Sequence, residues 1–218
     1  MTAAAALHLF FHDCILTGCD GSVLISSIPF NKAKRDANIN LSLLGDGFDV
    51  IVRAKTALEL ACPPSSLPAR MSYLATRNLV TMVGGPYYNV VLGRKDLLFS
   101  KASYVEGNLP QPHATFSDHS LSQIVHITIS AKLLGLIQLA ILVSPIPCEK
   151  HNLPKGLGLL ASDRAMYSDP RTKFDVDLYY KDQNAFFKAF GKAMEKLSVY
   201  GVKLGKMERI DVDVMLST

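Results

Sequence analysis

The apolar residues of this chain recur mainly at intervals of three and four, and this spacing restricts the folds that it can adopt. The clearest case is a segment that Asp182 would cap and that ends at Leu197. Phe186, Phe187, Phe190, Met194 and Leu197 would line one side of that helix. Because this period prevails over the strict alternation of half-buried strands, the sequence predicts a mainly α fold.

Three further segments carry helical signals. Residues 3–14 are good helix formers that run into a polar, glycine-rich loop, and residues 48–61 follow a Gly-Asp-Gly signal at 45–47. Residues 71–83 end before Gly84-Gly85-Pro86, where the proline prevents continuation. Residues 87–115 have no sustained period, so we expect a surface connection with a short hairpin around 88–92.

Length and charge narrow the possible classes of protein. A chain of 218 residues with 49% apolar residues can bury a sizeable core, and we expect one domain over residues 1–218. The net charge of +4 is spread without a basic block, so nucleic acid is not an expected partner. No apolar run reaches the roughly 18 residues of a membrane span. The start lacks the features of a secretory signal, so we expect that it begins inside a domain.

The densest group of chemically active residues runs from His12 to Ser22. Asp13, Asp20 and Ser22, together with loop carbonyls, offer the hard oxygen atoms that calcium prefers, with six to eight ligands at about 2.3 to 2.6 Å. The plainer alternative is a polar helix end followed by a turn, with His12 lining the core. Both interpretations stay open on these residues alone.

The cysteines of the same segment allow a further alternative. Cys14 and Cys19 enclose a short polar loop, which a disulfide between them would close. Together with His12 they could instead bind zinc, but that site would need a fourth ligand that no nearby motif provides. Cys62 and Cys148 are remote in sequence and do not complete a zinc framework.

The segment LHLFFHDCILTGCDGSVLISS resembles the distal-histidine signature of plant class III (secretory) haem peroxidases. The resemblance continues, in the order of that family, through GDGFDVIVRAKTALELACP, LATRNLVTMVGGPYYNVVLGRKDLLFSKAS, GNLPQPHATFSD, NLPKGLGLLASDRAMYSDPRTKF and KDQNAFFKAFGKAMEKLSVYGVK. It implies a haem-peroxidase-like helical fold that is incomplete. The distal half, about 1–118, and the C-terminal part, 152–204, match the family, whereas residues 119–151 do not.

The resemblance implies roles for individual residues. His12 corresponds to the histidine that moves a proton between the two oxygens of hydrogen peroxide, and Asn40 to the asparagine that orients that ring. Pro112 corresponds to the proline on the route of aromatic donors. Cys14 and Cys19 correspond to a family disulfide. The implied calcium ligands are Asp13, Leu16 (carbonyl), Gly18 (carbonyl), Asp20 and Ser22.

The same resemblance implies the molecules and the setting in which the chain works. The implied cofactors are haem b and calcium, and the implied substrates are hydrogen peroxide and small phenolic donors. The family also implies a monomer, an extracellular or vacuolar location and a part in the response to oxidative stress.

Two substitutions depart from the family pattern. His8 stands where the family has an arginine, which replaces a permanent forked cation by a ring that is largely neutral at pH 7; we expect O–O cleavage to slow by about two or more orders of magnitude. Lys34 stands where the family has a glutamate, which reverses a charge beside the calcium ligands and predicts weaker calcium binding.

The residues expected on the proximal side of the haem depart further from the family pattern. No S-G-x-H-T motif is present, and we interpret residues 119–151 as the product of an altered reading frame or splicing. The proximal ligand is therefore left unassigned, and Cys62 and Asp163 lack their family partners. The remaining histidines are His113, His119, His126 and His151. The sequence predicts a catalytically impaired peroxidase or, as the alternative, a non-catalytic calcium-binding or structural remnant.

Overall fold

The protein is mainly helical, as the apolar spacing predicts. The computed structural model describes residues 2–61, 68–91, 97, 99–109 and 167–200. The α-helices are α1 (Thr2–Thr17), α2 (Gly45–Ala61), α3 (Pro68–Met82), α8 (Pro170–Lys181) and α9 (Gln183–Val199). Short 3-10 helices are η1 (Ser22–Leu24), η2 (Lys34–Asp36), η3 (Asn38–Ser42) and η4 (Ala102–Tyr104). Extended pairing in this part of the chain is confined to an isolated bridge between Ile28 and Asn31.

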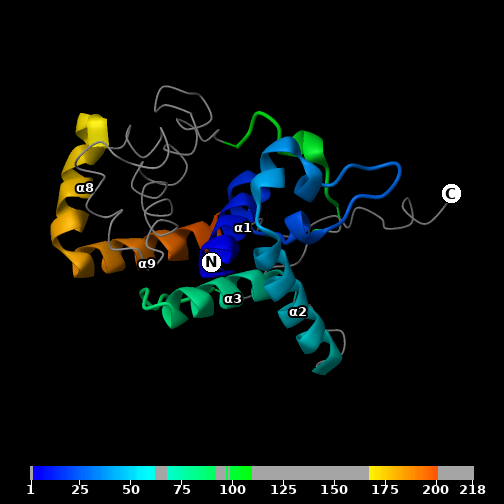
Figure 1. Ribbon diagram of the computed structural model, residues 1–218, viewed down its shortest axis with the longest axis horizontal. Helices are drawn as coiled ribbons and strands as arrows, with labels where there is room; N and C mark the ends of the chain where they lie inside the picture. The colour runs from blue at the N-terminus through cyan, green and yellow to red at the C-terminus, as the bar shows by residue number, and fades with distance from the viewer. Residues whose placement is uncertain (1, 62–67, 92–96, 98, 110–166, 201–218) are drawn as a thin grey trace.

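Helix α1 lies at the centre of the described structure. It packs against α2 and α3, and the end of α9 also reaches it (Figure 1). Helix α8 meets α9 at a sharp corner far from α1, so α9 connects that corner to the centre (Figure 1). Within the described residues, no helix has both the length and the apolar character that a membrane crossing requires.

The signals for helix ends are confirmed with small shifts. Asp182 caps α9, and its Oδ1 atom accepts the backbone N–H groups of Asn184 (2.8 Å) and Ala185 (3.1 Å). Helix α3 ends shortly before Gly84, whose φ of 87° is a left-handed conformation that suits glycine. The Gly-Asp-Gly signal, in contrast, forms the first turn of α2 and does not precede it.

Helix α1 is longer than the sequence predicted. It continues to Thr17, so Asp13 and Cys14 lie in its last turns and the loop begins only at Gly18. The apolar residues after Cys14 explain the extension, since Ile15 is buried and Leu16 packs partly against the core. Helix α1 therefore presents both core residues and the predicted site residues.

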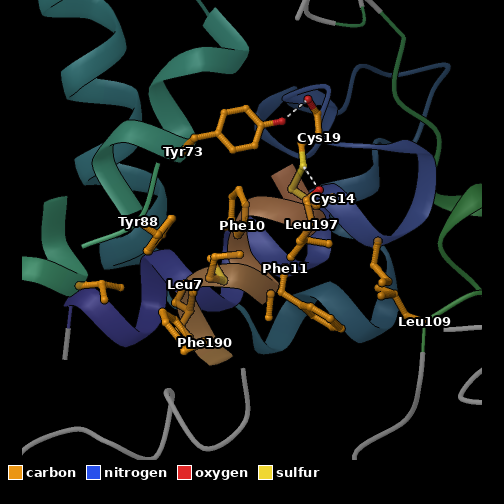
Figure 2. Close-up of a cluster of buried hydrophobic side chains, with 14 of the residues drawn as sticks. Leu7, Phe10, Phe11, Cys14, Cys19, Tyr73, Tyr88, Leu109, Phe190 and Leu197 are labelled. Atoms are coloured by element: carbon orange, nitrogen blue, oxygen red, sulfur yellow. Dashed lines mark hydrogen bonds between the residues drawn. A yellow bond between two sulfur atoms is a disulfide. The ribbon is translucent and has the colours of Figure 1, made fainter. Parts of the chain in front are cut away.

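The main core cluster joins α1, α3 and α9. Leu7 and Phe10 of α1 pack among Tyr73 of α3 and Phe190 and Leu197 of α9 (Figure 2). The apolar stripe predicted for α9 is confirmed, because four of its five members are buried and Phe187 is partly buried. Long-range packing of this kind fixes α9 against the N-terminal helix.

One hydrogen bond ties this core to the loop after α1. The Tyr73 hydroxyl donates to the carbonyl oxygen of Cys19 at 2.6 Å, and both residues are buried (Figure 2). Cys14 and Cys19 form a disulfide that closes the same loop. The end of α1 is therefore held by a covalent bond and by a buried hydrogen bond from α3.

The expected surface connection after α3 is partly wrong. Tyr88, Ala102, Val105 and Leu109 are buried, and Tyr88 meets Phe190 of α9 edge to face at 6.0 Å between ring centroids. Residues 87–91 contain no strand, so the described part of the predicted hairpin is absent. Isolated apolar residues packed under an irregular chain give no periodic signal, which explains the error.

Candidate active site

His12 is a buried ring whose orientation is fixed by a hydrogen bond. It is 6% exposed, and its Nδ1 atom lies 2.7 Å from Oδ1 of Asn40. The Asn40 Nδ2 group donates to the backbone oxygen of Lys34 at 2.7 Å, so Oδ1 is the amide atom that faces the ring. Because that oxygen can only accept, Nδ1 of His12 carries the hydrogen and Nε2 of the neutral ring keeps a lone pair.

His8 lies one helical turn before His12. The two ring centroids are 4.5 Å apart, and the ring planes are nearly perpendicular at 86°. Burial and, to a smaller extent, the nearby His8 lower the pKa of His12, and the hydrogen bond to Asn40 opposes them, so that the pKa of His12 lies at about 4. Burial also lowers the pKa of His8. Two neutral rings therefore stand side by side at pH 7.

Asp13 is buried directly after His12 and accepts two backbone N–H groups from the loop. Its Oδ2 accepts from Gly21 at 2.9 Å and its Oδ1 from Val23 at 3.3 Å. Burial and, to a smaller extent, the charge of Asp20 raise the pKa of Asp13, whereas the two N–H groups and Lys34 lower it, so that the pKa of Asp13 lies at about 7. Asp13 thus binds the loop backbone.

Lys34 extends into the same group of residues. Its side chain is 2% exposed, and its Nζ atom donates to Ser22 Oγ at 2.6 Å and lies 3.8 Å from Asp20 Oδ2. Asp20 Oδ1 accepts the N–H of Ser22 at 3.0 Å and also the Ser22 hydroxyl. The structure therefore brings Asp13, Asp20 and Ser22 together, but it places an ammonium group among them.

These oxygen atoms do not fit a calcium ion. Calcium needs six to eight oxygen ligands, whereas here the Asp13 oxygens accept N–H groups and Ser22 Oγ accepts from Lys34. A unit charge about 4 Å from the ammonium would meet a repulsion on the order of 4 kcal/mol at an effective dielectric constant near 20, and a divalent ion twice that. The described residues also include no group of three or more His, Cys, Asp or Glu side chains suited to a metal ion.

Two remaining members of the predicted calcium set lie at the loop entrance. Leu16 is in the last turn of α1, and Gly18 follows the helix with a φ of 86°. The zinc alternative is wrong, because the sulfur atoms of Cys14 and Cys19 are bonded to each other and are not available as thiolates.

The described residues fit one face of a haem site. His12 offers a basic Nε2 atom on the central helix, and Asn40 supports it. In the described ranges the histidines are His8 and His12, both on α1, so these ranges offer no imidazole for the opposite face. Pro112 and Asp163 lie outside the described residues, as do the histidines His113, His119, His126 and His151.

Sequence reasoning missed Ser100. Its hydroxyl donates to the Ser22 carbonyl oxygen at 2.8 Å and accepts the backbone N–H of Lys34 at 2.9 Å. Ser100 is fully buried and connects the loop after α1 to η2. No sequence signal identifies a lone serine in an irregular segment, because its role depends on contacts 66 and 78 residues away along the chain.

The family model and the similar proteins that match this chain are all peroxidases. The family model described as "Peroxidase" matches residues 1–132. Peroxidase 31 of Arabidopsis thaliana is 42% identical, with 96% of this chain and 82% of the relative covered. Peroxidase 63 of the same plant is 41% identical over 96% of this chain and 79% of the relative. Peroxidase 65 is 42% identical over 93% of this chain and 76% of its own length.

The alignment with Peroxidase 31 extends over 259 residues, more than the 218 residues of this chain. The relative therefore contains internal residues that have no counterpart here.

Proposed function

Because the chain belongs to the plant class III peroxidase family, we propose that it is a haem-dependent peroxidase with impaired activity, which oxidises small phenolic donors with hydrogen peroxide. His12 is its acid–base group. The observation that carries the proposal is the hydrogen bond from His12 Nδ1 to Asn40, since it leaves Nε2 as the basic atom.

His12 and Asn40 act as a unit in this proposal. Nε2 of His12 accepts a proton from hydrogen peroxide and returns it to the oxygen that leaves as water. Asn40 holds the ring and fixes its tautomer, and the backbone of Lys34 in turn holds Asn40. Haem, when bound, supplies the iron redox chemistry that breaks the O–O bond.

The low activity follows from His8. A neutral imidazole next to His12 offers no permanent positive charge where negative charge develops on the departing oxygen. Removing one such electrostatic group slows enzymes by about 10²- to 10³-fold. A proton on His8 would also raise the free energy of a proton on His12, because two cations 4.5 Å apart repel each other.

The wider proposal follows the family. The chain forms one domain over residues 1–218, acts as a monomer outside the cell or in the vacuole, and takes part in the response to oxidative stress. Pro112 lines the route of the phenolic donors. The proximal ligand is not assigned to any residue. Calcium is left out of the proposal, because Lys34 lies among the oxygen atoms that would bind it.

The test compares three forms of the full chain after addition of haemin: wild type, His12→Ala and His8→Arg. The readouts are the Soret absorption band and the oxidation of guaiacol at fixed peroxide. We expect His12→Ala to lower the rate by at least about 10²-fold and His8→Arg to raise it by a similar factor. His8→Gln, which adds no charge, is the matched control and should leave the low rate unchanged.

Two outcomes would contradict the proposal. If His12→Ala oxidises guaiacol as fast as the wild type, His12 is not the acid–base group. If the Soret band of haemin is neither sharpened nor shifted by the wild type, relative to free haemin, the second candidate function holds, that of a non-catalytic structural remnant.

A further inference from the structure

We infer that the ammonium group of Lys34 is the built-in cation of the loop formed by residues 18–22, and that this loop keeps its structure without calcium. The inference concerns the fold of the loop and is independent of the proposed peroxidase activity.

The burial of Lys34 is the first observation. Its side chain is only 2% exposed, and lysine is almost never buried to this extent unless it is paired. The Nζ atom donates to Ser22 Oγ at 2.6 Å and lies 3.8 Å from the Asp20 carboxylate. The charge of Lys34 is therefore compensated by the loop itself.

The backbone of Lys34 is held at the same place. Its N–H donates to Ser100 Oγ at 2.9 Å, and the Ser100 hydroxyl donates to the Ser22 carbonyl oxygen at 2.8 Å. Both ends of the lysine thus contact Ser22, directly through Nζ and indirectly through Ser100. A side chain anchored at both ends occupies a defined position and is not a surface lysine that happens to fold inward.

Lys34 and a calcium ion would compete for the same oxygen atoms. Ser22 Oγ accepts from Lys34 through one of its two lone pairs and donates its hydrogen to Asp20. A metal ion would have to displace these contacts to bind Asp20 and Ser22 together. It would also have to sit next to a fixed positive charge.

The number of carboxyl groups near Lys34 also argues against a calcium ion in this loop. The loop and the end of α1 contribute two carboxyl groups, Asp13 and Asp20, and the ammonium group of Lys34 pairs with Asp20. A glutamate at position 34, the residue of the resembling family, would instead give three carboxylates, the kind of set that the described residues lack. One substitution therefore separates a loop with its own cation from a loop suited to calcium.

The backbone of Lys34 also supports His12 through Asn40. The Lys34 carbonyl oxygen accepts from Asn40 Nδ2 at 2.7 Å, and Asn40 contacts the His12 ring. The orientation of His12 therefore depends on the position of the backbone at residue 34, which the contacts of the Lys34 ammonium group and of Ser100 hold in place, and removal of calcium should not disturb it.

The test measures thermal unfolding of the full chain by circular dichroism, in calcium chloride and in EGTA, and the calcium content after dialysis against calcium. The wild type should show the same midpoint in both solutions and no bound calcium. Lys34→Met should lower the midpoint by roughly 10 °C, because it leaves the partly buried Asp20 carboxylate and the buried Ser22 hydroxyl without the ammonium group. Lys34→Glu should bind calcium and unfold at a higher midpoint in calcium than in EGTA. Lys32→Met, which changes an exposed lysine of the same segment, is the matched control and should leave the midpoint unchanged.

The wild-type measurements decide the inference even if a variant does not fold. Stoichiometric calcium in the wild type, or a midpoint that falls in EGTA, would overturn it. A midpoint for Lys34→Met equal to that of Lys32→Met would do the same. Acetylation of the native wild-type chain gives an independent check by mass spectrometry, in which Lys32 should react and Lys34 should be protected. Equal labelling of the two lysines would contradict the burial on which the inference rests.

Discussion

Asn40→Ala tests the hydrogen-bonded chain that leads from Lys34 to His12. The substitution removes two buried bonds, each 2.7 Å long, and leaves the Nδ1 hydrogen of His12 and the carbonyl oxygen of Lys34 without their partner in Asn40. Each buried group left unsatisfied costs about 1 to 3 kcal/mol. We therefore expect the free energy of unfolding to fall by about 2 to 6 kcal/mol, a large part of the 5 to 15 kcal/mol typical of a domain.

The measurement is urea denaturation followed by circular dichroism. Asn38→Ala is the control, since Asn38 is exposed in the same 3-10 helix and should cost far less. Loss of the bond that supports the protonated ring should also lower the pKa of His12 further, which an NMR titration would detect. If Asn40→Ala destabilises the protein no more than Asn38→Ala, the Asn40 bonds do not hold the site together.

Two further predictions concern pH and the loop after α1. Histidines of the unfolded chain bind a proton near pH 6.5, whereas native His12 stays neutral down to about pH 4. Between these two values the unfolded state binds more protons than the native state. The contribution of His12 to stability therefore decreases as the pH falls from 6.5 to 4. In an NMR titration the chemical shifts of the His12 ring should change with a midpoint near pH 4, and a midpoint near 6.5 would contradict the burial of the ring. Asp13 has a raised pKa and therefore changes the stability in the opposite direction as the pH falls. Unfolding measurements on His12→Gln, compared with the wild type, separate the contribution of His12 from that of Asp13. Tyr73→Phe should lower the free energy of unfolding in urea by about 1 to 3 kcal/mol, because it leaves the buried Cys19 carbonyl without this donor. Tyr104→Phe, at an exposed tyrosine, should have little effect, and equal costs for the two changes would show that the Tyr73 bond contributes nothing.

The sequence predicts the helices well where the signal is local. Asp182 as a cap and the stripe from Phe186 to Leu197 are both correct, because capping and helical period depend on neighbouring residues. Helix α8 was missed, since its exposed Phe174 and Leu178 give no regular apolar stripe. The buried residues of the connection after α3 were also missed, because they do not recur at a regular interval along the sequence.

The site shows the same division between local and long-range information. The approach of His12 to Asn40 followed from a family resemblance and not from spacing, because the two residues are 28 positions apart. The charge reversal at Lys34 was visible in the sequence, but its hydrogen bond to Ser22 was not. Whether a lysine points to solvent or into a cluster of carboxylates depends on tertiary packing, which one sequence does not specify.

The central place of α1 has a consequence for how this protein changes during evolution. The helix that carries His12 also supplies Leu7 and Phe10 to the main core, and its end is anchored by Tyr73. Selection for a chain that folds would therefore preserve much of this helix even after catalysis ceased to matter. Substitutions on α1 that impair activity should therefore often impair folding as well, because the same helix serves both.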